Sequence, residues 1–149
     1  LPSGTIVEVF ASPTAASTRG LLGLVRASAS RSPLAYAALI GGARDAARAA
    51  RDALTSNDLV TALRAQIDAL GQLGALAEAP IVTPEVDELF ALATREGAAF
   101  GPSGAGGGDV AIFVGPAPSS ATFRLRAAAL DLTRLDATVG APGLHIARG

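Results

Sequence analysis

The segment from residue 101 to residue 109, Gly-Pro-Ser-Gly-Ala-Gly-Gly-Gly-Asp, constrains this chain more than any other. Glycine has no Cβ and readily adopts positive φ, so the segment is expected to be a loop whose backbone amides can turn inward around an anion. The hydroxyl of Ser103 adds a donor for a phosphate oxygen. A helical pattern precedes the loop, and a strand pattern at residues 110–114 follows it.

This order of elements excludes the two best-known glycine-rich phosphate loops. Both the Walker loop and the dinucleotide fingerprint place a strand before the glycines and a helix after them. The Walker loop also needs a lysine, whereas all twelve basic residues of this chain are arginine. A flexible surface connector remains the alternative, although the loop runs directly into the apolar strand without a polar spacer.

Composition narrows the class of protein further. With 149 residues, half of them apolar, the chain is long enough for one globular domain with a sizeable core. Its net charge of −1 offers no basic field for nucleic acid, and the absence of cysteine excludes disulfides and thiolate chemistry. No apolar run is long enough to cross a membrane, so we expect a cytoplasmic protein without a membrane partner. The first residue is Leu1, which suggests a piece of a longer chain or a processed product.

Periodicity and capping signals predict the secondary structure. Ser17 or Thr18 can cap one helix, Asn57 or Asp58 can open another, and Thr83 followed by Pro84 suits the start of a third. The predicted strands are 5–10, 110–114 and 144–147, and the predicted helices run from 18 to about 29, from 34 to 54, from 57 to about 73, from 84 to about 97 and from 121 to 135.

This succession of one strand, several helices, a strand, a helix and a last strand predicts an α+β fold. The best match is a ferredoxin-like plan, in which helices cover one face of a small antiparallel sheet. A doubly wound fold would need more strands at regular intervals.

Residues 102–109 resemble the third signature motif of the GHMP kinases, in the form found in phosphomevalonate kinases. Two further segments are similar to that same branch of the family. Residues 11–18 end in Ala-Ser-Thr, as does the stretch after the first strand of the C-terminal domain, and Thr83-Pro84-Glu85 resembles its Thr-Pro-Glu helix start. The family usually has a lysine immediately before Pro-Ser-Gly, where this chain has Gly101.

The resemblance implies that residues 1–149 form the C-terminal domain of such a kinase. The two other family motifs, which belong to the N-terminal domain, have no match here. ATP and Mg²⁺ would therefore bind mainly to an N-terminal domain outside this chain, and a small phosphorylated acceptor would lie between the two domains. The implied activity is transfer of the ATP γ-phosphoryl group to 5-phosphomevalonate. A kinase for mevalonate or a sugar, and a non-catalytic ligand-binding module, remain alternatives.

The resemblance also implies which residues bind the acceptor, while it assigns no catalytic base and no metal ligand. Ser103 would donate directly, and Asp109 would either face a metal or basic group or cap nearby amides. Ser17 and Thr18 would donate from a helix N-terminus or serve as an ordinary N-cap. The full predicted set is Ser17, Thr18, Ser103, Gly104, Ala105, Gly106, Gly107, Gly108 and Asp109.

Other polar residues are interpreted as structural. Arg44, Arg48 and Arg51 lie on one side of the predicted helix 34–54 and are expected to form a solvated face rather than a phosphate patch. Arg19, in the first turn of its helix, either contacts substrate phosphate or is solvated. His145 is expected to be structural and not a general base.

Overall fold

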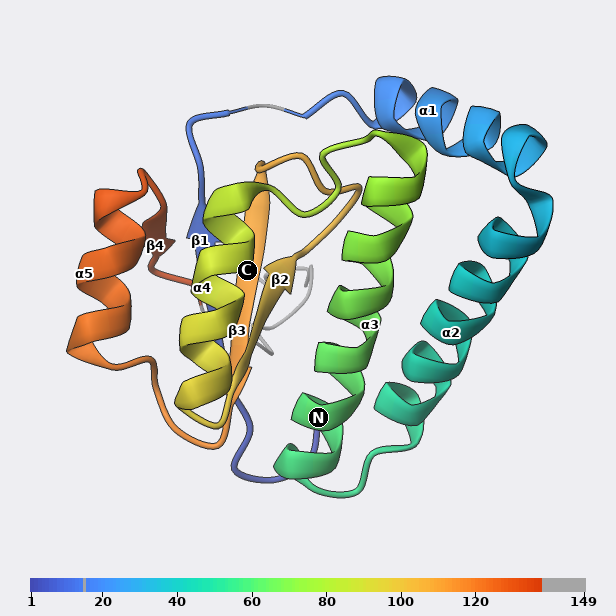
Figure 1. Ribbon diagram of the computed structural model, residues 1–149. Coiled ribbons are helices and arrows are strands. Elements are labelled where there is room, and N and C mark those ends of the chain that lie inside the picture. The colour runs from blue at the N-terminus through green and yellow to red at the C-terminus, as the bar shows by residue number, and fades with distance from the viewer. Residues whose placement is uncertain (15, 138–149) are drawn as a thin grey trace, which may run out of the picture.

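The computed structural model describes residues 1–14 and 16–137 (Figure 1). In this part of the chain the elements are β1 (Ile6–Ala11), α1 (Thr18–Arg31), α2 (Pro33–Asp52), α3 (Ser56–Ala77), α4 (Pro84–Arg95), β2 (Ala99–Pro102), β3 (Val110–Gly115), α5 (Ala121–Ala129) and β4 (Thr133–Leu135).

The strands form one four-stranded antiparallel sheet in the order β2-β3-β1-β4. Together with α4 before β2 and α5 before β4, this order is that of a ferredoxin-like fold and confirms the predicted α+β class. The register places Phe10 opposite Ala111, and Phe100 opposite Phe113. Because side chains alternate along a strand, these residues lie on one face of the sheet.

The main core lies between this face and helices α4 and α5, which run side by side in front of the sheet (Figure 1). Phe123 of α5 is fully buried among the rings of Phe10, Phe100 and Phe113, with centroids 5.0–5.6 Å apart and edge-to-face packing. Leu89 of α4 is fully buried in the same cluster. Edge-to-face pairs add about 0.5–1.5 kcal/mol each beyond the area that they bury.

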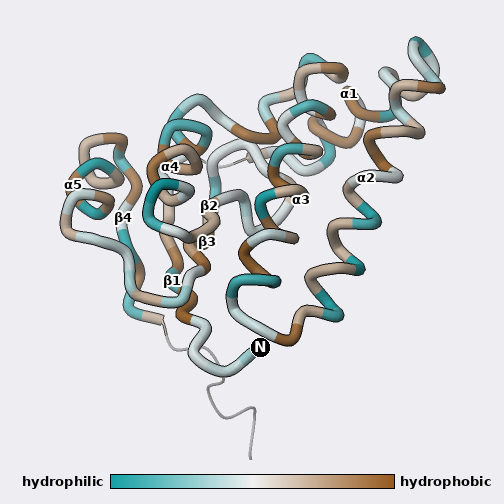
Figure 2. The backbone as a smooth tube through the Cα atoms, turned by 60° about the horizontal axis from the view of Figure 1, so that its bottom comes forward, coloured by the Kyte–Doolittle hydropathy of each residue, from teal (hydrophilic) through white to brown (hydrophobic). Residues whose placement is uncertain are grey.

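Helix α3 packs beside the edge strand β2 and reaches the opposite face of the sheet. Ile67 contacts Ala99, and the side chain of Ile67 also covers Gly101, where an added Cβ would lie only 2.5 Å from Ile67 Cγ1. The α2–α3 pair extends away from the sheet, and α1 lies across one end of it (Figure 1). Apolar residues concentrate on β1 and β3, at the centre of the sheet (Figure 2).

Two of the three predicted helix starts are confirmed, and the third lies a few residues from its predicted position. The Ser17 side chain accepts from the Gly20 amide at 3.2 Å, and the Thr83 hydroxyl accepts from Val86 at the start of α4. For α3 the prediction was off by a few residues, because Thr55 is the N-cap and forms a capping box with Asp58.

The structure corrects two predicted elements. The helix predicted for 121–135 ends at Ala129, since Asp131 adopts φ +60° and the chain then turns into β4. Strand β2 was missed, and it takes Gly101 and Pro102 out of the predicted loop. The predicted strand 144–147 lies outside the described residues. Among the described helices, none is both long and apolar enough to span a bilayer.

Candidate functional site

The glycine loop connects β2 to β3 through residues 103–109. Gly106, Gly107 and Gly108 have φ values of +86°, +81° and +93°, which other residues rarely adopt. A Cβ on Gly106 would overlap the carbonyl oxygen of Ile81, and one on Gly107 would lie 2.7 Å from the Cβ of Ala16. The loop therefore needs glycine for its conformation and for its close approach to two neighbouring segments.

Some of the loop amides are occupied by hydrogen bonds within the chain. Ser103 donates to the carbonyl oxygen of Val110 at 2.9 Å, and Gly107 donates to that of Ile81 at 3.1 Å. The carbonyl oxygen of Asp109 accepts from the Ser12 amide at 3.0 Å. The Gly107 amide is thus directed at the chain itself, so it is not among the amides that can turn toward an anion, although Gly107 belongs to the predicted set.

A small hollow of 110 Å³ lies on one side of the loop. It brings Thr18, at the N-terminus of α1, together with Ser103 and the following three residues. Asp109 adds a carboxylate, and no basic side chain is among the described residues of its wall. The hollow is lined by Ala16, Thr18, Ser103, Gly104, Ala105, Gly106, Asp109 and Val110. It contains six of the nine residues predicted from the sequence.

The other three predicted residues lie elsewhere. Ser17 is the N-cap of α1 and lines a shallow groove beside Leu21 and Leu24. Gly107 borders that groove as well, and both Gly107 and Gly108 border a larger cleft on the far side of the loop. The structure therefore divides the predicted site into a hollow with hydroxyl and amide donors and a separate set of loop residues.

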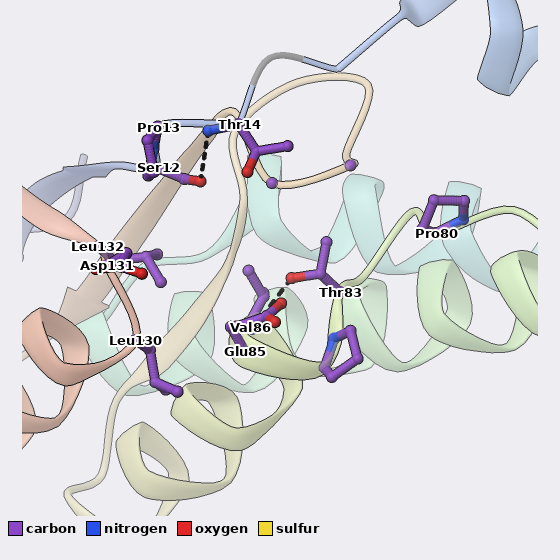
Figure 3. Close-up of a pocket in the computed structure, with 13 residues that line it drawn as sticks. Ser12, Pro13, Thr14, Pro80, Thr83, Glu85, Val86, Leu130, Asp131 and Leu132 are labelled. Atoms are coloured by element: carbon purple, nitrogen blue, oxygen red, sulfur yellow. Dashed lines mark hydrogen bonds between the residues drawn. The ribbon is translucent and has the colours of Figure 1, made fainter.

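Sequence reasoning did not find the larger cleft, whose volume is 420 Å³. In Figure 3, Ser12 and Thr14 lie across from Thr83 and Glu85, and Leu130 to Leu132 form a third side. Four segments that are far apart in the sequence meet there. Three of these segments carry sequence motifs, namely residues 11–18, Thr83-Pro84-Glu85 and the glycine loop, but nothing in the motifs indicates a cavity.

The cleft carries negative charge. Glu85 lies in the first turn of α4, where its own backbone amide and the Thr83 hydroxyl hold the pKa of the carboxyl below its usual value. Asp131 adds a second carboxylate to the wall. Among the described lining residues there is no arginine, so the cleft suits neutral or cationic groups better than anions.

Arg44, Arg48 and Arg51 form a solvated face of α2, as expected. Arg48 pairs with Asp45 at 3.5 Å and Arg51 with Asp52 at 2.8 Å, all with exposed side chains, and Arg44 is exposed on the same helix. Arg19 is also exposed. His145 lies outside the described residues.

A ferredoxin-like sheet with helices packed on it, and a glycine loop that meets a helix N-terminus, defines a small α+β domain. Comparison with protein families gives the particular family: the model for the C-terminal domain of GHMP kinases matches residues 50–129, more than half of the chain. The chain belongs to the GHMP kinase family as a C-terminal domain. A comparison with curated proteins gave no match.

Solved structures share the fold at low sequence identity. The Lin0012 protein from Listeria innocua has a TM-score of 0.80 and 21% identity over 91% of this chain. Phosphomevalonate kinase from Streptococcus pneumoniae, solved with phosphomevalonate and AMPPNP, has a TM-score of 0.71 and 19% identity over 88%. Mevalonate kinase from L. major, solved with R-mevalonate, has a TM-score of 0.67 and 19% identity over 87% of this chain. This chain spans 39%, 38% and 41% of those three chains, respectively.

Proposed function

We propose that this chain is the acceptor-binding C-terminal domain of an ATP-dependent kinase that converts 5-phosphomevalonate to 5-diphosphomevalonate. The observation that carries the proposal is the hollow beside the glycine loop, where Ser103 and Thr18 meet the N-terminus of the 14-residue helix α1. A helix N-terminus favours anions through its unpaired amides and its dipole. The phosphate of the acceptor fits this environment.

In phosphoryl transfer a protein mainly positions the reacting groups and stabilises developing charge. Here Ser103 and the free amides of the loop would orient the acceptor phosphate. The Gly107 amide has no such role, because it donates to Ile81. Thr18 would donate a second hydroxyl from the opposite wall.

The described residues do not fit a nucleotide with its metal ion. The chain has no lysine, the hollow has one carboxylate, and no cluster of three or more metal-ligating side chains occurs within residues 1–14 and 16–137. We therefore assign ATP and Mg²⁺ to an N-terminal domain outside residues 1–149. A cytoplasmic setting stays a prediction.

A second candidate is a GHMP kinase for an unphosphorylated acceptor such as mevalonate or a sugar. Asp109 in the wall of the hollow, and the glycine at position 101, favour it, because a phosphorylated acceptor benefits from nearby positive charge. A non-catalytic binding module is the third candidate. The sequence upstream of Leu1 distinguishes it, since a Gly-Leu-Gly-Ser-Ser segment there would indicate a kinase.

An ADP-release assay tests the proposal. The 149-residue chain alone is expected to show negligible turnover, and the chain joined to its N-terminal domain is expected to prefer 5-phosphomevalonate over mevalonate. In the joined protein Ser103→Ala should lower kcat/KM by about 10–100-fold, while Ser30→Ala, at an exposed position of α1, should not. Robust turnover by the chain alone, or equal use of unphosphorylated acceptors, would contradict the proposal.

A further inference from the structure

The sheet has a second apolar face, on the side away from α4 and α5, which we call the rear face. The strand register defines it, since Val9 lies opposite Ile112 on one neighbouring strand and Leu135 on the other. Because successive side chains of a strand point to opposite faces, these residues point away from the aromatic core. The described strand residues on the rear face are Val7, Val9, Ala11, Ala99, Gly101, Val110, Ile112, Val114, Thr133 and Leu135.

Helix α3 covers the rear face at the edge strand β2, where Ile67 packs on Ala99 and Gly101. Farther across the sheet the cover is incomplete. All three rear-face residues of β1 are only half-buried, as are two of the three on β3, and Leu135 of β4 is 42% exposed. A sheet with apolar residues on both faces is stable when both are covered. The rear face over β1 and β4 therefore suits a further layer of protein.

The hollow beside the glycine loop lies at one end of the rear face. Val110, the first residue of β3, belongs to the rear face and also lines the hollow. The 420 Å³ cleft is bordered instead by Val86 and Leu132, which belong to the core in front of the sheet. A body that packs on the rear face would therefore reach the hollow and not the cleft.

The start of the chain lies at the other end of the sheet. Ile6 begins β1 and pairs with Gly115 at the end of β3, whereas the glycine loop joins β3 at Val110. The N-terminus and the β2–β3 connection accordingly lie at opposite ends of the sheet in Figure 1. The six residues of β1 span roughly 17 Å. A domain that precedes Leu1 and also faces the hollow has to extend along the length of the sheet.

We propose that the rear face over β1 and β4 is the surface on which the N-terminal domain of the longer polypeptide packs. This chain spans 38–41% of the three similar solved chains, which leaves more than half of such a chain to form the additional layer. Helices α4 and α5 occupy the front of the sheet, and α3 occupies the rear of β2. The inference rests on the proposed function, because it takes that domain to carry the nucleotide to the hollow.

The composition of the rear face defines the chemistry of the surface that it fits. Its described residues are valine, isoleucine, leucine, alanine, glycine and one threonine, and none of them is charged. Burial of such a surface is favourable against another apolar surface and unfavourable against a charged one. The contacting side of the N-terminal domain should therefore be apolar as well.

Cysteine labelling tests the proposal, because the chain has no cysteine of its own. Val9→Cys and Leu135→Cys each place one thiol on the rear face, and a maleimide should label both in the 149-residue chain. In the chain joined to its N-terminal domain, labelling at both positions should slow by about tenfold or more, as mass spectrometry of the labelled peptides would show. Leu125→Cys is the matched control. It lies 73% exposed on α5 and should react equally in both proteins.

Leu135→Asp provides a second measurement, because this side chain is already partly exposed. The substitution should leave the urea midpoint of the 149-residue chain unchanged. In the joined protein it should lower ADP release by about tenfold, since the carboxylate would be buried against an apolar partner. Leu125→Asp should change neither quantity.

Equal labelling of the rear-face thiols with and without the N-terminal domain would overturn the inference, whichever acceptor the joined enzyme uses. Slow labelling in the 149-residue chain alone would also overturn it, because this chain would then cover its own face. Protection that appears only as the concentration of that chain is raised would place a second copy there, with the same consequence. A joined protein that protects the rear face but does not phosphorylate 5-phosphomevalonate would contradict the proposed function and leave the docking surface standing.

Discussion

The amide of Gly107 donates a 3.1 Å hydrogen bond to the carbonyl oxygen of Ile81, in the segment that joins α3 to α4. The same carbonyl lies against Gly106 so closely that no side chain fits there. The glycine loop is therefore held by the backbone of a segment that is distant in the sequence.

Gly106→Ala should destabilise the chain by at least about 2 kcal/mol, because alanine is strained at positive φ and its Cβ would overlap the Ile81 carbonyl. Gly104→Ala is the matched control. Its φ is not in the positive range and an added Cβ would meet nothing within 4 Å, so its effect should stay within about 0.5 kcal/mol. Urea denaturation measures both, and equal effects would contradict this account of the loop.

Gly101→Ala should cost about 1–3 kcal/mol, because the new Cβ would press against Ile67. In combination with Ile67→Ala the cost of the second change should largely vanish, which a double-mutant cycle of unfolding free energies would detect. Gly42→Ala, on α2 with open space around it, should instead stabilise the chain by up to about 1 kcal/mol. Strict additivity at positions 67 and 101 would disprove the contact.

Glu8 is buried on β1, where it accepts from the Ser119 amide at 3.0 Å and pairs with Arg134 at 2.9 Å. Glu8→Ala should destabilise by about 1–3 kcal/mol or more, because it leaves the buried amide without an acceptor. Glu8→Gln retains an oxygen for that amide and should cost less. Thermal denaturation compares them, and a glutamine variant that is no more stable than the alanine variant would exclude this role.

Glu88 of α4 and Arg126 of α5 form a two-pronged ion pair, with Arg126 Nη2 2.8 Å from Glu88 Oε2. The hydrogen bond from Arg126 lowers the pKa of the Glu88 carboxyl below its ordinary value of 4.5. Because the folded pKa is the lower one, the pair stabilises the fold above pH 4.5 and this contribution is lost as pH falls through the lowered value.

Arg126→Gln should therefore reduce stability at pH 7 and have a smaller effect at pH 3. Urea midpoints at the two pH values measure the difference. Arg44→Gln, at an exposed position of α2, is the charge-matched control and should show no such convergence. Both side chains of the pair are about half exposed, so added salt should shrink the effect at pH 7.

The sequence predicts the helices well where capping residues mark their starts, as Ser17 and Thr83 do. It does not predict β2, because a four-residue strand with glycine and proline has low intrinsic β-propensity and forms through the burial of Phe100 and the close approach of Ile67. The turn at Asp131 is missed for a similar reason, since a left-handed aspartate ends α5 without a glycine.

The candidate site divides in the same way. The hollow could be predicted, because its donors lie in two short segments with recognisable composition, around Thr18 and Ser103. The cleft could not, because it combines residues from four segments that are far apart in the sequence. The hydrogen bond from Gly107 to Ile81 has no sequence signal, and it removes an amide that composition alone assigns to an anion.

Phe100 has a further consequence for the loop that follows it. Its ring packs between Phe10 and Phe123, while the next residue, Gly101, lies against Ile67 of α3. If β2 slid by one residue, the ring would point at Ile67 and the glycine would face the aromatic cluster. An extra residue inserted between 103 and 109 therefore cannot be absorbed by slippage of the strand and must bulge into the hollow or outward. We therefore expect that a change in the length of this loop would strongly affect which ligands fit this domain.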